Sequence, residues 1–471
     1  MSVNLQIKKA ATVFVENLLG KGRSHSFVSS ANVRQKLVLD SVNYFLSKIV
    51  PGLMGFVSVL VFVRVIGYEQ YGHYAVIFAI AMASASGMAG WLTQGILRFQ
   101  SQFSEQSELS SFSHAAVMGT FISIVLGGIL LSLIIPISGV QEGVLTIISV
   151  ALFASLLAYT VALARFQASL QSRKVLQYEV ARSVACFIVP LVFMLITGSR
   201  QYWVLLLGMA LGYLFPLCQS VYVFFKRLHA THERGHYFSP SERVFIVKLW
   251  SFGWPVALWI LCQQGLLVSD RFFIQRFSGF ANTGIYSSMY DVVVRSFSLL
   301  FMPVTLAVHP LVMDCWNSGN RKQALAAIRS GVKYQILMFI PIAAVLTIAA
   351  PWVVRAVLGK PVPQAASLVL PLALGGFLWQ TCLLAHKPLE ILCQTKRMFA
   401  GMMAALIVNV AGNWLLIPKY GYQASAYLTV ASSTLYLLSL LILTPRKEFL
   451  RAAEVEVTAD SIAEECVTAS L

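Results

Sequence analysis

The chain has 471 residues, of which 58% are hydrophobic and only 11% are charged. Soluble domains carry about 25% charged residues, so this composition excludes an assembly of soluble domains and indicates a protein that lies mostly in lipid. The net charge of +16 does not imply nucleic acid as a partner, because membrane proteins that concentrate Lys and Arg in cytoplasmic loops are basic by default.

The N-terminal tail, residues 1–42, is polar and mixed in character. It contains no apolar stretch followed by a small-residue cleavage site, so we expect no signal peptide, and the first apolar span serves as the insertion signal. Within the tail, NLQIKKAATVFVENLLGKG has apolar residues at helical spacing with lysines between them. This stretch is either an interfacial amphipathic helix or a loosely structured segment.

Apolar runs of about 20 residues recur from the end of the tail to residue 444, and each is long enough to cross a hydrocarbon core of roughly 30 Å as a helix. They predict an all-α integral membrane protein with about twelve transmembrane helices. The expected spans are 43–66, 74–97, 114–138, 144–168, 178–197, 202–225, 246–268, 284–311, 328–354, 365–386, 397–418 and 423–444.

The orientation follows from the distribution of Lys and Arg outside these spans. With the N-terminus in the cytoplasm, the cytoplasmic side holds 22 of these residues and the far side holds 7. The positive-inside rule therefore predicts that both termini are cytoplasmic.

An internal repeat links the first and second halves. VRVIGYEQYGHYAVIF (63–78) and QRFSGFANTGIYSSMY (275–290) align at an offset of 212 residues. The shared residues predict a structural turn with aromatic anchors at the membrane interface. Six positions match: Arg64 with Arg276, Gly67 with Gly279, Tyr68 with Phe280, Gly72 with Gly284, Tyr74 with Tyr286, and Phe78 with Tyr290.

Six spans separate the two copies, so both enter the membrane in the same direction, as in transporters built from two parallel six-helix lobes. We expect lobes at 43–226 and 246–444, a cytoplasmic linker at 227–245, and a disordered cytoplasmic tail at 445–471.

Motifs for metal, nucleotide or redox chemistry are weak. HERGH at 232–236 matches the zinc-protease pattern, but Gly235 and the nearby Pro240 disfavour the helix that the two histidines need, so we predict no metal site. The phosphate-binding pattern G-x-x-x-x-G-K-[ST] is absent, and no soluble segment could hold a nucleotide-binding domain. The seven cysteines form no C-x-x-C pair and are expected to be inert. We expect no cofactor and no enzymatic activity.

Ionisable residues within or at the edges of the spans are the candidate site residues, because a charge at membrane depth is costly unless it faces a cavity or a partner. Seven of these ten are basic, which suits an anionic substrate such as a phosphate-bearing headgroup. They are Lys48, Arg165, Glu179, Arg182, Lys248, Asp270, Arg271, Asp291, Arg295 and Lys333.

Five of these cations form the predicted substrate-binding set of a cationic cavity. Arg165 and Lys248, like Arg182, lie near cytoplasmic ends and could instead extend to the interface. Lys48 and Lys333 lie deeper, and Arg295 can pair with Asp291 four residues earlier on one helix face. That pair is either purely structural or an ion pair in the lumen that opens when substrate or a proton arrives.

Asp270 and Arg271 break the symmetry of the repeat, since their counterparts at the same offset are Ser58 and Val59. Together with Asp291 they are therefore candidates for coupling or gating at the periplasmic mouth. A local salt bridge between Asp270 and Arg271 is the alternative.

Two stretches carry a family resemblance. VRVIGYEQYGHYAVIFAIAMASASGMAGWLTQGILRF and FGWPVALWILCQQGLLVSDRFFIQRFSGFANTGIYSSMY resemble the Wzx-type polysaccharide and O-antigen flippases, which share a superfamily with the MATE exporters and the lipid II flippase. The resemblance covers roughly residues 40 to 445 and implies a V-shaped pair of six-helix lobes around a cationic cavity.

The resemblance also implies a function. Such proteins move an undecaprenyl-diphosphate-linked oligosaccharide across the bacterial inner membrane by alternating access, coupled to an ion gradient. The cargo serves lipopolysaccharide or exopolysaccharide synthesis, and the implied partners are membrane lipids and polysaccharide polymerase or chain-length proteins.

Two other functions compete with lipid-linked glycan flipping. A MATE-like, cation-coupled exporter of small molecules would favour carboxylates deep in the first half, but the acids between Asp40 and Glu142 all lie in predicted loops. A membrane glycosyltransferase or polymerase would need a large external loop. The longest one expected is about a dozen residues, around Arg271 to Ala281.

Overall fold

The computed structural model describes residues 31–103, 106–137, 143–218, 240–318, 320–392 and 394–444. The amphipathic stretch of the N-terminal tail, the HERGH sequence and the C-terminal tail lie outside the described residues. The elements found are α2 (Ala31–Ile66), α3 (Tyr68–Phe99), η1 (Gln100–Gln102), α4 (Gln106–Ile137), α5 (Gly143–Ala168), α6 (Ser172–Thr197), α7 (Tyr202–Leu214), η2 (Phe215–Leu217), α9 (Pro240–Asn317), α10 (Arg321–Leu358), α11 (Pro363–Ala366), α12 (Val369–Ala385), α13 (Lys387–Ile391), α14 (Thr395–Tyr420) and α15 (Gln423–Leu443).

The helices have the length and composition of membrane spans. Ten helices in the described ranges are long and apolar enough to cross a membrane, and Tyr202–Leu217 is a shorter apolar helix. One of the ten is α9, whose 78 residues are interrupted at Gly279. Each part of α9 exceeds the roughly 20 residues that one crossing needs. The all-α membrane class is confirmed, and the count of twelve spans stays a prediction.

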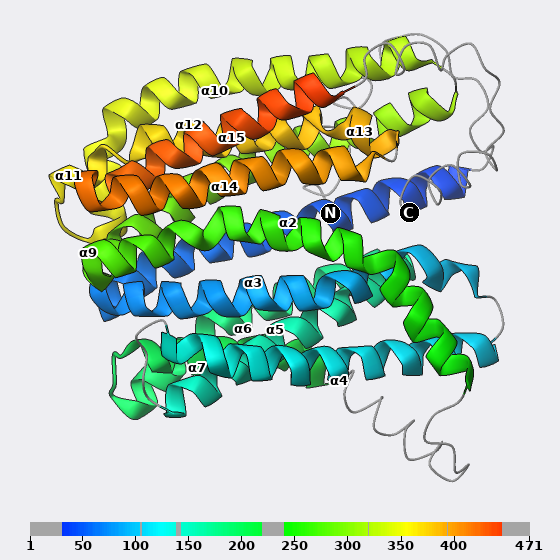
Figure 1. Ribbon diagram of the computed structural model, residues 1–471, viewed down its shortest axis with the longest axis horizontal. Helices are drawn as coiled ribbons and strands as arrows, with labels where there is room; N and C mark the ends of the chain where they lie inside the picture. Colours follow the sequence, from blue (N-terminus) through cyan, green and yellow to red (C-terminus); the bar gives the residue numbers. More distant parts are fainter. Residues whose placement is uncertain are drawn as a thin grey trace.

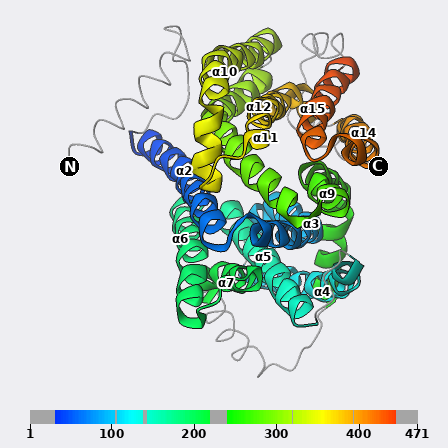
Figure 2. The same ribbon diagram turned by 90° about the vertical axis from the view of Figure 1, so that its left-hand side faces the viewer.

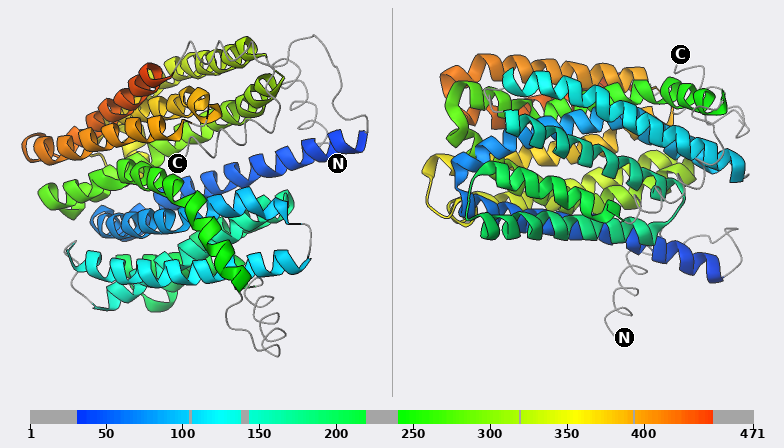
Figure 3. Two further views of the ribbon diagram at one scale, coloured as in Figure 1. Left: turned by 45° about the vertical axis from the view of Figure 1, so that its right-hand side comes forward. Right: turned by 90° about the horizontal axis from the view of Figure 1, so that it is seen from below.

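The helices pack as two lobes with a common long axis. The first lobe consists of α2 to α7, and the second consists of α9 to α15 (Figure 1). Seen from the end, α3 and α9 lie between the two groups (Figure 2), and they pack along each other. Figure 3 shows the same division in two further views, with the first part of α9 rising from the side of the first lobe.

Apolar side chains cover the outside of the molecule as well as its core. Phe121, Ile129 and Leu133 on α4 are each more than half exposed, and so are Leu337, Ile340 and Ile348 on α10. A soluble monomer rarely exposes such continuous apolar faces. Hydrocarbon chains of a bilayer are the surroundings that suit them.

The repeat copies meet each other at one end of the molecule. Gly67 and Gly279 have nearly the same backbone conformation, with φ of 82° and 81°. Gly72 and Gly284 instead lie inside helices, where a Cβ on Gly72 would overlap the Phe280 carbonyl and a Cβ on Gly284 would overlap the Tyr68 carbonyl. The contact is reciprocal, as in an interface between two identical patches.

The loop expected around Arg271 to Ala281 is absent, because α9 runs through this stretch and turns only at Gly279. The expectation was wrong because the charges of Asp270 and Arg271 were interpreted as the end of a span. Both side chains are buried and find partners inside the protein. They lie about 13 Å along the helix from the turn, and not in an external loop. The second predicted span likewise begins earlier, at Tyr68.

Candidate functional site

Asp291 is the centre of a charged cluster between the lobes. Its Oδ1 atom lies 3.1 Å from Nη2 of Arg271 and 3.5 Å from Nη2 of Arg295. The Tyr71 hydroxyl of α3 donates to Oδ2 at 3.1 Å. The three charged residues belong to α9 and the tyrosine belongs to the first lobe, so the cluster connects the two.

Arg271 comes from the first part of α9, and its ion pair is with Asp291 after the turn. Its Nη1 atom donates to the Leu267 carbonyl at 3.0 Å, and its guanidinium lies 5.0 Å from the centre of the Tyr290 ring. Asp270 accepts the Arg271 backbone N–H at 2.9 Å and the Tyr286 hydroxyl. Arg271 thus forms its ion pair with Asp291, 20 residues later, and not with its neighbour Asp270.

The members of this cluster differ in exposure. The side chains of Arg271 and Asp291 are 7% and 13% exposed, whereas that of Arg295 is 45% exposed. Arg295 faces α2, where a Cβ added to Gly55 would lie 3.1 Å from its Nη1 atom. Of the three, Arg295 has the most exposed side chain.

A second charged cluster lies in the first lobe around Glu179. Nζ of Lys48 lies 3.3 Å from Oε1 of this carboxylate, and Nη2 of Arg182 lies 2.7 Å from Oε2. The Arg182 guanidinium also packs over the rings of Tyr159 and Tyr213, at 5.4 and 5.2 Å. Lys48 is the accessible member, with 39% of its side chain exposed against 18% for Arg182.

Lys48 lies on the side of α2 against which Arg295 of α9 packs. Gly52 of this helix packs against Leu299 of α9, and Gly55 packs against Arg295. Lys48 lies four and seven residues before these glycines, so it shares their helix face. Its backbone is about 10 Å along the axis from Gly55. Lys48 and Gly55, the glycine beside Arg295, therefore lie about two turns apart on α2.

The other predicted cations do not join them. Arg165 bonds to Ser113 at 3.0 Å, and Lys248 lies 4.5 Å from the Phe99 ring centre. Phe99 is about 40 Å along α3 from Tyr71, so these two cations belong to the opposite end of the helix. Lys333 is exposed on α10. The five predicted cations are thus distributed over the molecule, and of them Lys48 lies on α2 and Arg295 packs against it.

A buried network of uncharged polar groups lies in the second lobe and was not predicted. Asn409 accepts from Ser269 and Asn413, both at 2.9 Å, and donates to Ser432 at 3.2 Å. Ser425 donates to Asn413 at 2.7 Å. The spacing of Asn409 and Asn413, one helical turn apart within an apolar span, is the signal that could have revealed it.

This network adjoins Asp270. The Tyr286 hydroxyl that donates to Asp270 lies 3.5 Å from the Thr429 hydroxyl. A cavity of about 10 Å³ lies beside Tyr290, Thr429 and Ser432, about the volume that one water molecule requires. No group of three or more metal-ligating His, Cys, Asp or Glu residues occurs within the ranges that the structure describes.

A sequence model of the family described as "Polysaccharide biosynthesis protein" matches residues 38–316, more than half of the chain. Curated protein sequences gave no match.

Three solved structures with the same fold are distant from this chain in sequence. The lipid II flippase MurJ in an inward closed conformation is 15% identical, with a TM-score of 0.66 over 92% of this chain and 97% of that one. An inward-facing multidrug resistance MATE family transporter of the MOP superfamily is 13% identical, with a TM-score of 0.62 over 88% and 96%. A MOP superfamily transporter from Pyrococcus furiosus is also 13% identical, with a TM-score of 0.59 over 88% and 95%. At these identities the likeness shows the fold alone.

Proposed function

Since the chain belongs to the polysaccharide biosynthesis protein family, we propose that it moves a lipid-diphosphate-linked oligosaccharide across the bacterial inner membrane for cell-surface polysaccharide synthesis. The family and the fold support a flippase or transporter role. The expected lipid is undecaprenyl diphosphate, and the glycan is an O-antigen, lipopolysaccharide or exopolysaccharide unit. Both termini would face the cytoplasm.

The observation that carries the proposal is the unequal exposure of the cations around each buried carboxylate. Asp291 has buried Arg271 and accessible Arg295, and Glu179 has Arg182 and the more accessible Lys48. When an accessible cation turns toward a diphosphate, the arginine that stays keeps the carboxylate neutralised. The buried carboxylate then keeps a partner. An unpaired buried carboxylate would be strongly unfavourable.

Alternating access requires contacts between the lobes that can break and reform. The Tyr71 hydroxyl of the first lobe and Asp291 of the second form such a contact. We therefore assign coupling or gating to Asp270, Arg271 and Asp291, because a ligand that draws Arg295 away removes one partner of Asp291 and leaves this carboxylate to Arg271, whose backbone N–H bonds to Asp270. The remaining predicted cations, Arg165, Lys248 and Lys333, have no role in this scheme.

The second candidate is a MATE-like, ion-coupled exporter of small molecules. One observation favours it: Glu179 places a buried carboxylate within the first lobe, beside the rings that pack on Arg182. A cationic drug, however, would meet two accessible cations at the lobe boundary, which disfavours its binding.

The experiment that tests the proposal compares Lys48→Gln and Arg295→Gln with the wild type. Both variants should reach the membrane and lower export of the lipid-linked glycan at least about tenfold, the effect of losing a charge-assisted hydrogen bond. Arg276→Gln is the matched control, since Arg276 is exposed on α9 away from both clusters. Normal glycan export in both variants would exclude this assignment. Loss of drug export with unchanged surface glycan would favour the exporter.

A further inference from the structure

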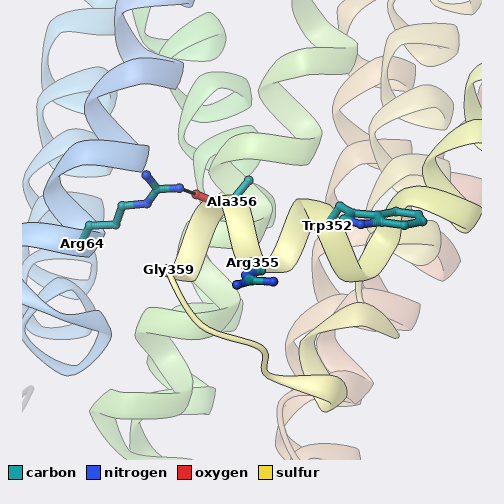
Figure 4. A pocket seen from close by; sticks show the side chains of 5 residues that line it. All are labelled: Arg64, Trp352, Arg355, Ala356 and Gly359. Carbon is teal, nitrogen blue, oxygen red and sulfur yellow. Dashed lines mark hydrogen bonds between the residues drawn. The ribbon is translucent and has the colours of Figure 1, made fainter.

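A pocket of about 500 Å³ lies where the last turns of α2 and α10 meet. Arg64 of α2 lines it, together with Trp352, Arg355, Ala356 and Gly359 at the end of α10. Figure 4 shows Arg64 extending to α10, with Arg355 and Trp352 on the last turns of that helix. Both lobes therefore contribute side chains to it.

Arg64 connects the lobes by donating from Nη2 to the Ala356 carbonyl oxygen. Because α10 ends at Leu358, this carbonyl is one of the last four, which have no partner within the helix. These carbonyls form the negative end of the helix dipole, where a cation is favoured. A guanidinium has five N–H donors, so Arg64 keeps donors for another group.

The positive charge of the pocket is not balanced by an acid. None of its lining residues is acidic, and within the described part of the chain neither Arg64 nor Arg355 belongs to an ion pair. Both arginines are exposed. Lys360 adds a third cation nearby, 4.4 Å from the centre of the Tyr68 ring. Two guanidiniums without a carboxylate favour an anion between them.

The depth of the pocket points to the kind of anion. Arg64 and Arg355 each lie within the last turn of an apolar helix. At that depth the hydrocarbon core gives way to lipid headgroups and their phosphates. Trp352 is 68% exposed, and its amphipathic ring is typical of this interface.

We propose that this pocket, which Trp352 also lines, binds a phosphate group between Arg64 and Arg355. The phosphate belongs either to the headgroup of an anionic phospholipid or to a soluble phosphate compound. Because the two guanidiniums come from different lobes, the bound phosphate holds the lobes together at this end. The inference does not depend on the transported substrate.

The test uses the full-length protein with two probes. Glycerol 3-phosphate is titrated into the detergent-solubilised protein by calorimetry, and the thermal midpoint is compared in phosphatidylcholine nanodiscs with and without phosphatidylglycerol. Arg355→Gln should weaken binding of the soluble probe at least about tenfold, or remove the rise in midpoint that phosphatidylglycerol produces. Arg276→Gln, an exposed arginine at the repeat position equivalent to Arg64, should behave like the wild type.

The two probes distinguish the sources of the phosphate. A response only to phosphatidylglycerol assigns the pocket to a lipid headgroup, and binding of glycerol 3-phosphate in detergent assigns it to a soluble phosphate compound. The proposal is overturned by a wild type that responds to neither probe. It is equally overturned if Arg276→Gln loses the response as fully as Arg355→Gln, since binding would then depend only on overall charge.

Discussion

At the scale of single residues, the site depends on how buried and accessible cations share one carboxylate. Arg271 is held by Asp291, the Leu267 carbonyl and the Tyr290 ring. Arg295 shares the carboxylate from an accessible position at a longer distance. We therefore expect Arg271 to stabilise the cluster through which coupling would act, and Arg295 to be the cation that can turn toward a ligand.

This difference predicts that Arg271→Gln and Arg295→Gln reduce the free energy of unfolding by different amounts. Arg271→Gln breaks a buried ion pair and should lower the free energy of unfolding by about 3 kcal/mol. Arg295→Gln removes a half-exposed partner and should lower it by about 1 kcal/mol or less while transport falls. Thermal unfolding in detergent, measured beside glycan export, checks both. Equal destabilisation by the two variants would contradict the division of roles.

The sequence identified the charged residues at membrane depth but not all of their partners. The pair of Asp291 and Arg295 follows from one helix, because residues four apart share a face. The pair of Asp291 and Arg271 forms across the turn at Gly279, which spacing alone does not reveal. The hydrogen-bond network around Asn409 was not predicted, because a few amide and hydroxyl side chains leave the overall hydropathy of a span apolar.

At the scale of the elements, the length of the apolar runs predicted where helices occur. Charged residues, expected at the ends of spans, led to wrong helix boundaries. Within the described residues each predicted span overlaps a helix, and the span 202–225 is described only as far as Cys218. The segment from Arg271 to Ala281 was expected to be a loop and is helical up to the turn at Gly279. Each repeat copy uses its two glycines differently. Gly279 provides a positive φ, whereas Gly284 lets α9 approach α3 until backbone touches backbone. A sequence pattern does not separate these two uses.

The close approach predicts a large effect for one added methyl group. Gly284→Ala would place a Cβ into the Tyr68 carbonyl and push α9 from α3. We expect a loss of about 2 kcal/mol, as for an overpacked core. Gly128→Ala is the matched control, because its Cβ would meet Val150 at an ordinary 3.4 Å. The thermal midpoints of the two variants give the measurement, and similar values would show that the glycine contact is not tight.

At the scale of the whole molecule, several contacts join the lobes at one end. Gly72 and Gly284 touch there, Arg64 bonds to the end of α10, and Nζ of Lys360 lies 3.4 Å from the Tyr68 hydroxyl. If transport alternates the opening of the two ends, these contacts must break in every cycle. Holding them closed should therefore stop transport.

Cross-linking across the lobes tests this requirement. Tyr68→Cys with Lys360→Cys, treated with a reducible bifunctional thiol reagent, should lose glycan transport and regain it on reduction. Gln364→Cys with Gln423→Cys is the control within one lobe, since the Gln423 side chain lies 3.4 Å from the Gln364 carbonyl. Both pairs are made in a chain in which exposed Cys218, together with Cys393 and Cys466 outside the described residues, is replaced by Ser. Transport that continues in the cross-linked first pair would argue against opening at this end.

The single-residue turn of α9 also bears on how the chain enters the membrane during synthesis. Asp270 and Arg271 precede Gly279, whereas the partners Tyr286 and Asp291 follow it. Emerging alone, the first part of α9 would carry two charged groups into lipid at a cost of several kcal/mol. Its neutralising groups arrive only with the second part. We therefore expect the two parts of α9 to enter the membrane together, as one helical hairpin.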